Sequence, residues 1–300
     1  MYYYRLYGLR VISDLEFPQL VEEQDTMPEA PAICIQAGEI PEQIRNVTDR
    51  QYEFGETTGW LSNKTTWLFV ENGEKITYRL KEGGNKMYLL TYILGYGMSM
   101  LAMQRGMLSI HCSALSDGKQ AVLIAGESGT GKSTITAAFL ERGYRLMADD
   151  MALVEMVDGM AFAKPAFPYQ KLCRDVALKQ GYDLHELLYI NEEKDKFLVP
   201  YKGMFDLQAV PIKAFIMLGF TKGEEVMTRQ ITGLDRFHVF ANNLFLRHLL
   251  GADKYKPAIG QKCLQMAAVV PTYYIGRPAG RDTIKQVLEE AFYMAVDACE

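Results

Sequence analysis

Hydrophobic and polar residues alternate with a period of two over much of residues 1–82, which is the pattern of half-buried β-strands. Residues 65–70 and 75–80 show the alternation most clearly. Asn72-Gly73 between them predicts a two-residue hairpin turn, because both turn residues must adopt positive φ. The charged, glycine-bearing stretch 80–86 then interrupts the pattern. We therefore expect a smaller β-rich N-terminal module over residues 1–85, built from antiparallel strands.

The remaining chain, residues 86–300, alternates short strands with helices after one long apolar segment. That segment, Met87 to Gln104, has no charged residue, but its glycines, hydroxyl residues and tyrosines favour a buried helix over a membrane span of ~20 apolar residues. The order strand, loop, helix, strand over 121–148 is a βαβ-type unit, so we expect an α/β domain. We expect strands over 107–115, 121–125, 144–148 and 210–220, and helices over 134–143, 172–188, 235–251 and 284–298.

Composition excludes several classes of protein. The hydrophobic fraction of 49% is sufficient for a large core, and the net charge of −5, without a basic run, argues against a nucleic-acid partner. The five cysteines are scattered without CxxC spacing, which is typical of free thiols in a reducing compartment. The first ten residues lack the apolar core of a secretory signal. We therefore expect a cytoplasmic protein without a membrane partner.

One segment carries a specific chemical motif: Gly126 to Ser133, GESGTGKS, satisfies G-x-x-x-x-G-K-[ST] at every fixed position. Glycines allow the backbone N–H groups to converge on phosphate oxygens, the lysine supplies a cation, and the serine hydroxyl can bind Mg²⁺. An apolar strand before the loop and a helix after it are the context that the motif requires. The sequence predicts a site for a nucleoside triphosphate, taken as ATP, with Mg²⁺. Its predicted binding residues are Gly126, Glu127, Ser128, Gly129, Thr130, Gly131, Lys132, Ser133 and Thr134.

Asp149 and Asp150 follow the strand after the loop helix, where ligands of open α/β sheets gather. One carboxylate can hold Mg²⁺ together with Ser133, and the other can accept a proton from an attacking hydroxyl. His111 lies in a strand upstream, where a histidine is as readily a core residue as a catalytic one. The loop alone names no reaction, since ATPases, GTPases, kinases and regulatory modules that bind nucleotide without catalysis share it.

The segments HCSAL (111–115), GESGTGKST (126–134) and ERGYRLMADDMALVE (141–155) together resemble the catalytic core of the HPr kinase/phosphorylase family. That family belongs to the phosphoenolpyruvate carboxykinase-like group of P-loop folds. The resemblance covers about residues 107–155. It implies phosphoryl transfer to a serine or threonine hydroxyl, with His111 assisting the aspartate base. It also implies that Asp149 is the base, that Lys132 holds the phosphates and that Asp150 binds the metal, although the sequence does not settle the order of the two acids. Such enzymes assemble into rings, so the resemblance also admits a homo-oligomer.

The stretch 161–176 lacks the glycine-rich signature that the bifunctional enzymes use for their phosphorylase activity. This stretch and residues 4–20 are instead similar to short kinases that phosphorylate the carboxy-terminal serine of lasso-peptide precursors. The resemblance therefore predicts a peptide or small protein as the acceptor, with HPr or a free hydroxy amino acid as the alternatives.

Arg277 and Arg281 lie in a polar loop near the carboxyl terminus. Arginine suits the charge of a phosphoryl-transfer transition state, so both are candidates for phosphate binding. The alternative is a polar loop in which Asp282 caps the last helix.

Overall fold

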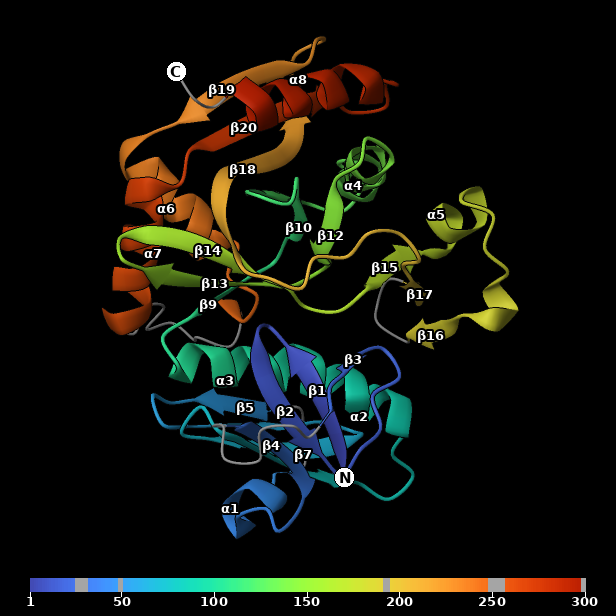
Figure 1. Cartoon of the computed structure of the whole chain (residues 1–300), viewed down its shortest axis with the longest axis vertical. Coiled ribbons are helices and arrows are strands. Elements are labelled where there is room, and N and C mark those ends of the chain that lie inside the picture. Colours follow the sequence, from blue (N-terminus) through green and yellow to red (C-terminus); the bar gives the residue numbers. More distant parts are fainter. Residues whose placement is uncertain (25–31, 48–50, 191–194, 248–256, 298–300) are drawn as a thin grey trace.

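The structure, a computed structural model, describes residues 1–24, 32–47, 51–190, 195–247 and 257–297. It has a mixed α/β architecture with an eight-stranded, a nine-stranded and a three-stranded sheet. Figure 1 shows the eight-stranded sheet at one end of the molecule and the nine-stranded sheet at the other, with a helix between them.

Residues 2–80 form the eight-stranded sheet, in the order β3-β1-β2-β4-β8-β7-β6-β5. Most neighbours are antiparallel as expected, but β2–β4 and β4–β8 are parallel pairs. The strands are β1 (Tyr2–Leu6), β2 (Leu9–Ser13), β3 (Val21–Glu22), β4 (Ala32–Ala37), β5 (Gln51–Phe54), β6 (Thr58–Ser62), β7 (Thr66–Glu71) and β8 (Lys75–Leu80). The short helix α1 (Glu42–Arg45) follows β4.

The hairpin expected at Asn72-Gly73 is confirmed. Asn72 and Gly73 have φ values of 53° and 66°, and the Glu74 N–H donates to the Glu71 carbonyl at 3.0 Å. Positive φ at both central residues is the geometry that suits the twist of two antiparallel strands. The local sequence therefore sets the register of β7 against β8.

The apolar segment after the first sheet is a buried helix interrupted by a wider turn. It consists of α2 (Lys86–Tyr92), a π-turn (Ile93–Gly97) and α3 (Met98–Gln104). The Asn85 side chain caps its start by accepting from the Met87 N–H at 2.8 Å. The helix lies between the two large sheets, and one continuous hydrophobic core joins all three. No helix within the described ranges is long and apolar enough to cross a membrane.

The nine-stranded sheet has three parallel strands, β11, β18 and β20, side by side in its interior. Strand β10 separates β11 from β12 and is antiparallel to both, so β11–α4–β12 is a crossover unit with one strand inserted. The strands are β9 (Leu108–Ile110), β10 (Ser113–Ser116), β11 (Ala121–Gly126), β12 (Arg145–Ala148), β13 (Ala152–Val157), β14 (Met160–Lys164), β18 (Val210–Thr221), β19 (Met227–Ile231) and β20 (Thr272–Pro278).

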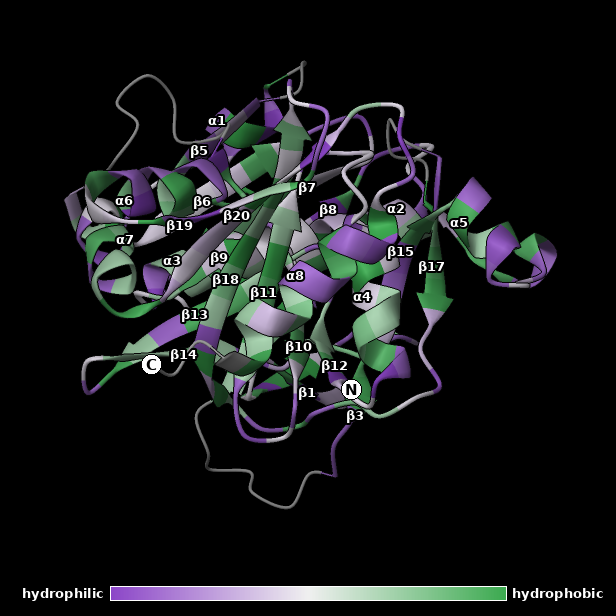
Figure 2. Cartoon of the chain, turned by 90° about the horizontal axis from the view of Figure 1, so that it is seen from above, coloured by the Kyte–Doolittle hydropathy of each residue, from purple (hydrophilic) through white to green (hydrophobic). Residues whose placement is uncertain are grey.

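Side chains of β11 point alternately into two cores. Val122 and Ile124 pack beneath α4 (Lys132–Glu141) and α8 (Ile284–Asp297), whereas Leu123 belongs to the core shared with the first sheet. Helices α6 (Gly233–Asn242) and α7 (Pro257–Val269) also pack into the core shared with the first sheet. Figure 2 shows the hydrophobic strands β11 and β18 in the middle of the molecule, with α4 and α8 lying over them. The sheet is therefore covered on both faces, which explains why β11 reads as a continuous apolar run.

Three of the expected elements differ from the structure. Residues 107–115 form two strands, β9 and β10, because the chain leaves one sheet neighbour for another at His111-Cys112. The helix expected over 235–251 ends at Asn242, and its last residues lie outside the described ranges.

The helix expected over 172–188 is also wrong for most of its length. Only α5 (Arg174–Lys179) and a 3₁₀ turn (Leu184–Glu186) are helical. Residues 172–173 and 188 belong to a three-stranded sheet, made of β15 (Tyr169–Cys173), β17 (Lys196–Pro200) and β16 (Leu188–Ile190). Pairing of β15 with β17 overrides the helical spacing of the apolar residues.

Candidate functional site

The glycine-rich loop connects β11 to α4, as the motif requires. Gly131 precedes the helix with φ of 105°, a conformation that favours glycine. A Cβ on Gly126 would come within 2.8 Å of the Leu218 carbonyl oxygen and of Thr130 Oγ1, so only glycine fits there. The Thr130 hydroxyl donates to the Glu127 carbonyl at 2.7 Å and is buried. This buried hydrogen bond of Thr130 stabilises the conformation of the loop.

A hollow of about 440 Å³ lies over this loop. It brings together most of the residues that the sequence singled out, from β11, α4, the end of β12 and β20. Thr130 and Arg281 are outside its lining. The predicted residues that line it are His111, Gly126, Glu127, Ser128, Gly129, Gly131, Lys132, Ser133, Thr134, Asp149, Asp150 and Arg277.

Asp149 is half-buried at the edge of the hollow, and both of its carboxylate oxygens accept hydrogen bonds. The Ser113 hydroxyl donates to Oδ1 at 2.7 Å, and the Lys171 backbone N–H donates to Oδ2 at 2.8 Å. No ion pair to Asp149 occurs among the described residues. Two donors from different strands therefore fix the orientation of a carboxylate that carries no neutralising partner in this part of the chain.

Asp150 is buried and is the centre of a cluster of positive charge. Lys171 Nζ lies 2.9 Å from Oδ2, and Lys196 Nζ lies 3.5 Å from Oδ1. Burial alone would raise the pKa of this carboxyl, but Lys171, Lys196, His111 and Lys132 together hold its pKa well below the usual range. Asp150 is therefore ionised and paired with two ammonium groups, which a metal ion at this carboxylate would have to displace.

His111 sits at the break between β9 and β10 and contacts Asp150 rather than Asp149. Its Nδ1 lies 2.8 Å from the Asp150 carbonyl oxygen, which can only accept, so Nδ1 carries the hydrogen. Nδ1 lies 3.8 Å from the Asp150 carboxylate. Burial and Lys132 hold the His111 pKa below its ordinary value, although Asp150 opposes them. The expected direct support of Asp149 by His111 is absent from these contacts.

The two candidate arginines differ in position. Arg277 lines the hollow from β20, and its Nε has no hydrogen-bond partner among the described residues although it is buried. Its guanidinium also donates to the Arg281 carbonyl at 2.7 Å. Arg281 itself is turned to Glu224, at 3.0 Å from the carbonyl and 3.5 Å from the carboxylate. The structure therefore places Arg277 at the hollow and Arg281 behind it.

Sequence reasoning missed the lysines that hold the acid pair. Lys171 of β15 and Lys196 of β17 lie on one face of the small sheet, because Lys171 pairs with Leu198 and Cys173 with Lys196. Their alternation with the buried Leu172 and Phe197 is compatible with two strands, but neither strand alone shows that both lysines reach one carboxylate. Other residues at the site that were not anticipated are Ser113, Cys173, Asp175 and Val176.

The donor set suits a magnesium ion that is bound mainly through phosphate. No group of three or more histidine, cysteine or acidic side chains that could hold a metal is found in the described ranges. Mg²⁺ in phosphate-transfer sites is commonly held by one or two protein oxygens, phosphate oxygens and waters. Ser133 and Asp150, the ligands that the resemblance implies, both lie at the hollow. The residues fit a nucleotide-bound metal and do not fit an independent metal centre.

Comparison with known proteins gives similarity to solved structures alone. No protein-family model matches the sequence, and no curated protein matches it. The structure is similar to the HPr(Ser) kinase/phosphatase from Coxiella burnetii, with 14% identity and a TM-score of 0.31. The match covers 63% of this chain and 98% of that chain. A TM-score this low gives no support for a shared activity.

Proposed function

We propose that this chain is an ATP-dependent kinase that transfers the γ-phosphoryl group to a serine hydroxyl on a peptide or small protein. The observation that carries the proposal is the meeting of Lys132, Ser133, Arg277 and the Asp149–Asp150 pair in one hollow over a glycine-rich loop. Loop amides, Lys132 and the positive end of α4 would bind the phosphates. The unpaired, buried Nε of Arg277 gives this corner of the hollow a further donor for an anion.

Asp149 is the residue that we assign as general base. The acceptor hydroxyl gives its proton to the Asp149 carboxylate, and its oxygen bonds to the γ-phosphorus as the bond to the β-phosphate oxygen breaks, which releases ADP. Ser113 and Lys171 hold the carboxylate in place for this step. Mg²⁺, bound by Ser133 and an acid of the pair, would neutralise charge on the phosphates. The ion pair between Asp150 and Lys171 would compensate part of the negative charge that the acid pair brings to the phosphates.

The acceptor that we favour is the carboxy-terminal serine of a lasso-peptide precursor. This finer proposal is supported by the similarity of residues 4–20 and 161–176 to kinases of that kind. HPr and free serine are the competing acceptors, and a module that binds nucleotide without catalysis is the competing class.

Incubation with γ-³²P-labelled ATP, Mg²⁺ and each acceptor separates these alternatives. We expect label on the precursor peptide and no label when its terminal serine is replaced by alanine. Label on HPr or free serine alone would change the acceptor but keep the kinase. If nucleotide binds and none of the three acceptors becomes labelled, the kinase proposal fails and the binding module is favoured.

Cysteine labelling gives a test of nucleotide binding that does not need an acceptor. Cys173 lines the hollow, whereas Cys34 belongs to β4 of the first sheet and is outside the lining of the hollow. Burial raises the pKa of Cys112 and Cys263 to about 12, so their thiols should remain unreactive at pH 8. We expect ATP with Mg²⁺ to slow alkylation of Cys173 about 10-fold or more, measured by peptide mass spectrometry. Cys34 is the internal control, and equal protection of both thiols, or of neither, would contradict the site.

A further inference from the structure

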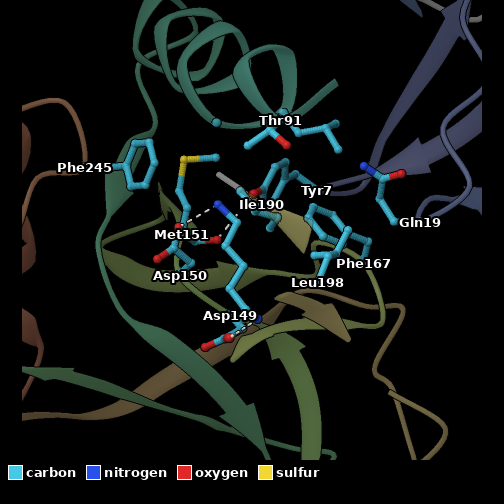
Figure 3. A pocket seen from close by; sticks show the side chains of 13 residues that line it. Tyr7, Gln19, Thr91, Asp149, Asp150, Met151, Phe167, Ile190, Leu198 and Phe245 are labelled. Atoms are coloured by element: carbon cyan, nitrogen blue, oxygen red, sulfur yellow. Dashed lines mark hydrogen bonds and ion pairs between the residues drawn. The ribbon is translucent and has the colours of Figure 1, made fainter. Parts of the chain in front are cut away.

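The acid pair also borders an apolar slot whose lining, in the described part of the chain, includes no residue of the glycine loop. The slot has a deep part of about 30 Å³ and an adjoining part of about 40 Å³. In Figure 3, Asp149 and Asp150 lie below this space, Thr91 lies above it, and Phe245 and Phe167 lie on opposite sides. Thr91, Gly95, Lys171, Ile190 and Phe245 line both parts.

The π-turn in the buried helix forms part of the slot, through Leu94, Gly95 and Tyr96. π-turns are rare and often occur at functional sites. Here the turn places Gly95, which has no side chain, opposite the Phe245 ring. A Cβ built on Gly95 would lie 3.6 Å from that ring, so one methyl group fits but a larger side chain would enter the slot. Gly95 therefore keeps the slot open.

Aromatic rings form a continuous wall from the helix surface to His111. The ring centroids of Tyr92 and Tyr96 are 5.9 Å apart, those of Tyr96 and Phe245 are 6.2 Å apart, and those of Phe245 and His111 are 6.1 Å apart. Such spacing is typical of favourable ring contacts. The rings are tilted against one another, and the aromatic surface that they form ends beside the acid pair.

Lys171 joins the slot to the nucleotide hollow, because it lines both. Its ammonium group binds Asp150 and its backbone N–H binds Asp149. The charged residues among the described lining of the slot are these three, and they already bind one another. The ammonium group of a free amino acid could pair with Asp149, but its carboxylate would lie beside two acids, which is costly. An apolar group of a longer chain has no such cost.

We propose that the slot receives the acceptor peptide, with an apolar or aromatic side chain next to the serine packed between Gly95 and Phe245. This inference rests on the proposed kinase function and adds the specificity of its acceptor. The serine hydroxyl then lies at Asp149, while the peptide approaches from the side opposite the nucleotide. The first sheet contributes through Tyr7, whose hydroxyl donates to the Met151 carbonyl at 3.3 Å, and through Gln19. Both modules thus build the acceptor site.

The test uses two arrayed libraries of synthetic peptides, one with an internal serine and one with a carboxy-terminal serine, in which the neighbouring residues vary. For the wild-type chain we expect kcat/KM to be about 10-fold or more higher with phenylalanine or leucine next to the serine than with glycine or glutamate. The Gly95→Leu variant fills the slot and should remove this preference, through a raised KM for the phenylalanine peptide. Gly95→Ala adds one methyl group and should raise the KM for the phenylalanine peptide less than Gly95→Leu does. The KM for ATP is the internal reference.

Phe245→Ala is a second variant, which opens the wall instead of filling the slot and is also expected to remove the preference. The inference is overturned if the wild-type chain phosphorylates peptides without preference, or if both variants that fold, judged by circular dichroism, keep the wild-type preference. Failure of the kinase function itself looks different: the wild-type chain binds ATP but phosphorylates no member of either library.

Discussion

Replacement of Asp149 by asparagine is expected to lower phosphoryl transfer by roughly 10²–10⁴-fold, the range that general-base catalysis provides. The amide is too weak a base to accept the hydroxyl proton. Asparagine is nearly isosteric and keeps the Oδ1 acceptor for Ser113. Nucleotide affinity should therefore change little, which isothermal titration with ATP or a non-hydrolysable analogue would measure beside the transfer rate.

The Ser113→Ala variant is the matched control for this experiment. It removes the hydrogen bond to Oδ1 of Asp149, 2.7 Å long, but keeps the carboxylate. Its loss of transfer should be much smaller than that of Asp149→Asn, because the Lys171 N–H still orients the acid. Equal losses in the two variants would mean that Asp149 acts through position rather than through its basicity.

Replacement of Asp150 by asparagine should destabilise the fold by about 3–5 kcal/mol, the cost of breaking a buried ion pair by removing one member. Lys171 and Lys196 have side chains that are 14% and 17% exposed, and both point at this carboxylate. Without it, two ammonium groups repel each other in a poorly solvated place. Urea denaturation at pH 7 measures the loss.

The same substitution at Asp158 is the control, because Asp158 is exposed and, like Asp150, has a positive φ of 49°. Asp158→Asn should change the stability very little. A similar loss for both variants would show that backbone conformation, rather than the ion pairs, explains the effect at Asp150.

Acid should reduce the difference between the wild-type chain and Asp150→Asn. The pKa of Asp150 is lower in the folded chain than in the unfolded chain, where it is about 3.9. Its contribution to stability is therefore complete above that unfolded value and is lost as the pH falls through the folded value. Comparison of the two proteins at pH 7 and at pH 3 tests the sign, and a difference that grows in acid would contradict it.

Features with a local cause could be predicted from the sequence. Asn72-Gly73 determines its turn because few residues adopt positive φ, and the confirmed register of β7 and β8 follows from it. The strand, glycine loop and helix around Lys132 are equally local, since the loop needs glycine at Gly126 for close packing against Leu218. The buried helix at 86–104 could be predicted because its polar and glycine residues are unsuited to lipid.

The partners of the acid pair could not be predicted, because they depend on contacts between distant segments. Lys171 and Lys196 reach Asp150 only when β15 pairs with β17 in one register. Nothing in either strand alone distinguishes these lysines from surface lysines. The helical spacing of 172–188 was misleading for the same reason, since strand pairing outside the segment decided its conformation.

The position of His111 shows a similar limit. A histidine after three apolar strand residues is compatible with a core position or a site position. The structure resolves this because the chain changes sheet neighbours at His111, and its backbone N–H donates to the Asn243 carbonyl at 2.7 Å. Its ring then meets Phe245 on one side and the Asp150 carbonyl on the other. The contacts of the His111 ring therefore depend on the pairing of β9 with β13 and of β10 with β11, which the local sequence does not show.

The π-turn at Ile93–Gly97 has a consequence for how related chains are to be aligned. A π-turn holds one residue more than an α-helical turn and is wider, so it takes up that residue without turning one half of the helix by the roughly 100° of an α-helical residue. Deletion of a single residue there would close it to an ordinary α-helical turn, and Gly95 would lose its place opposite Phe245. A one-residue gap between Tyr92 and Met98 would therefore mark homologues that keep the nucleotide loop but bind a different acceptor.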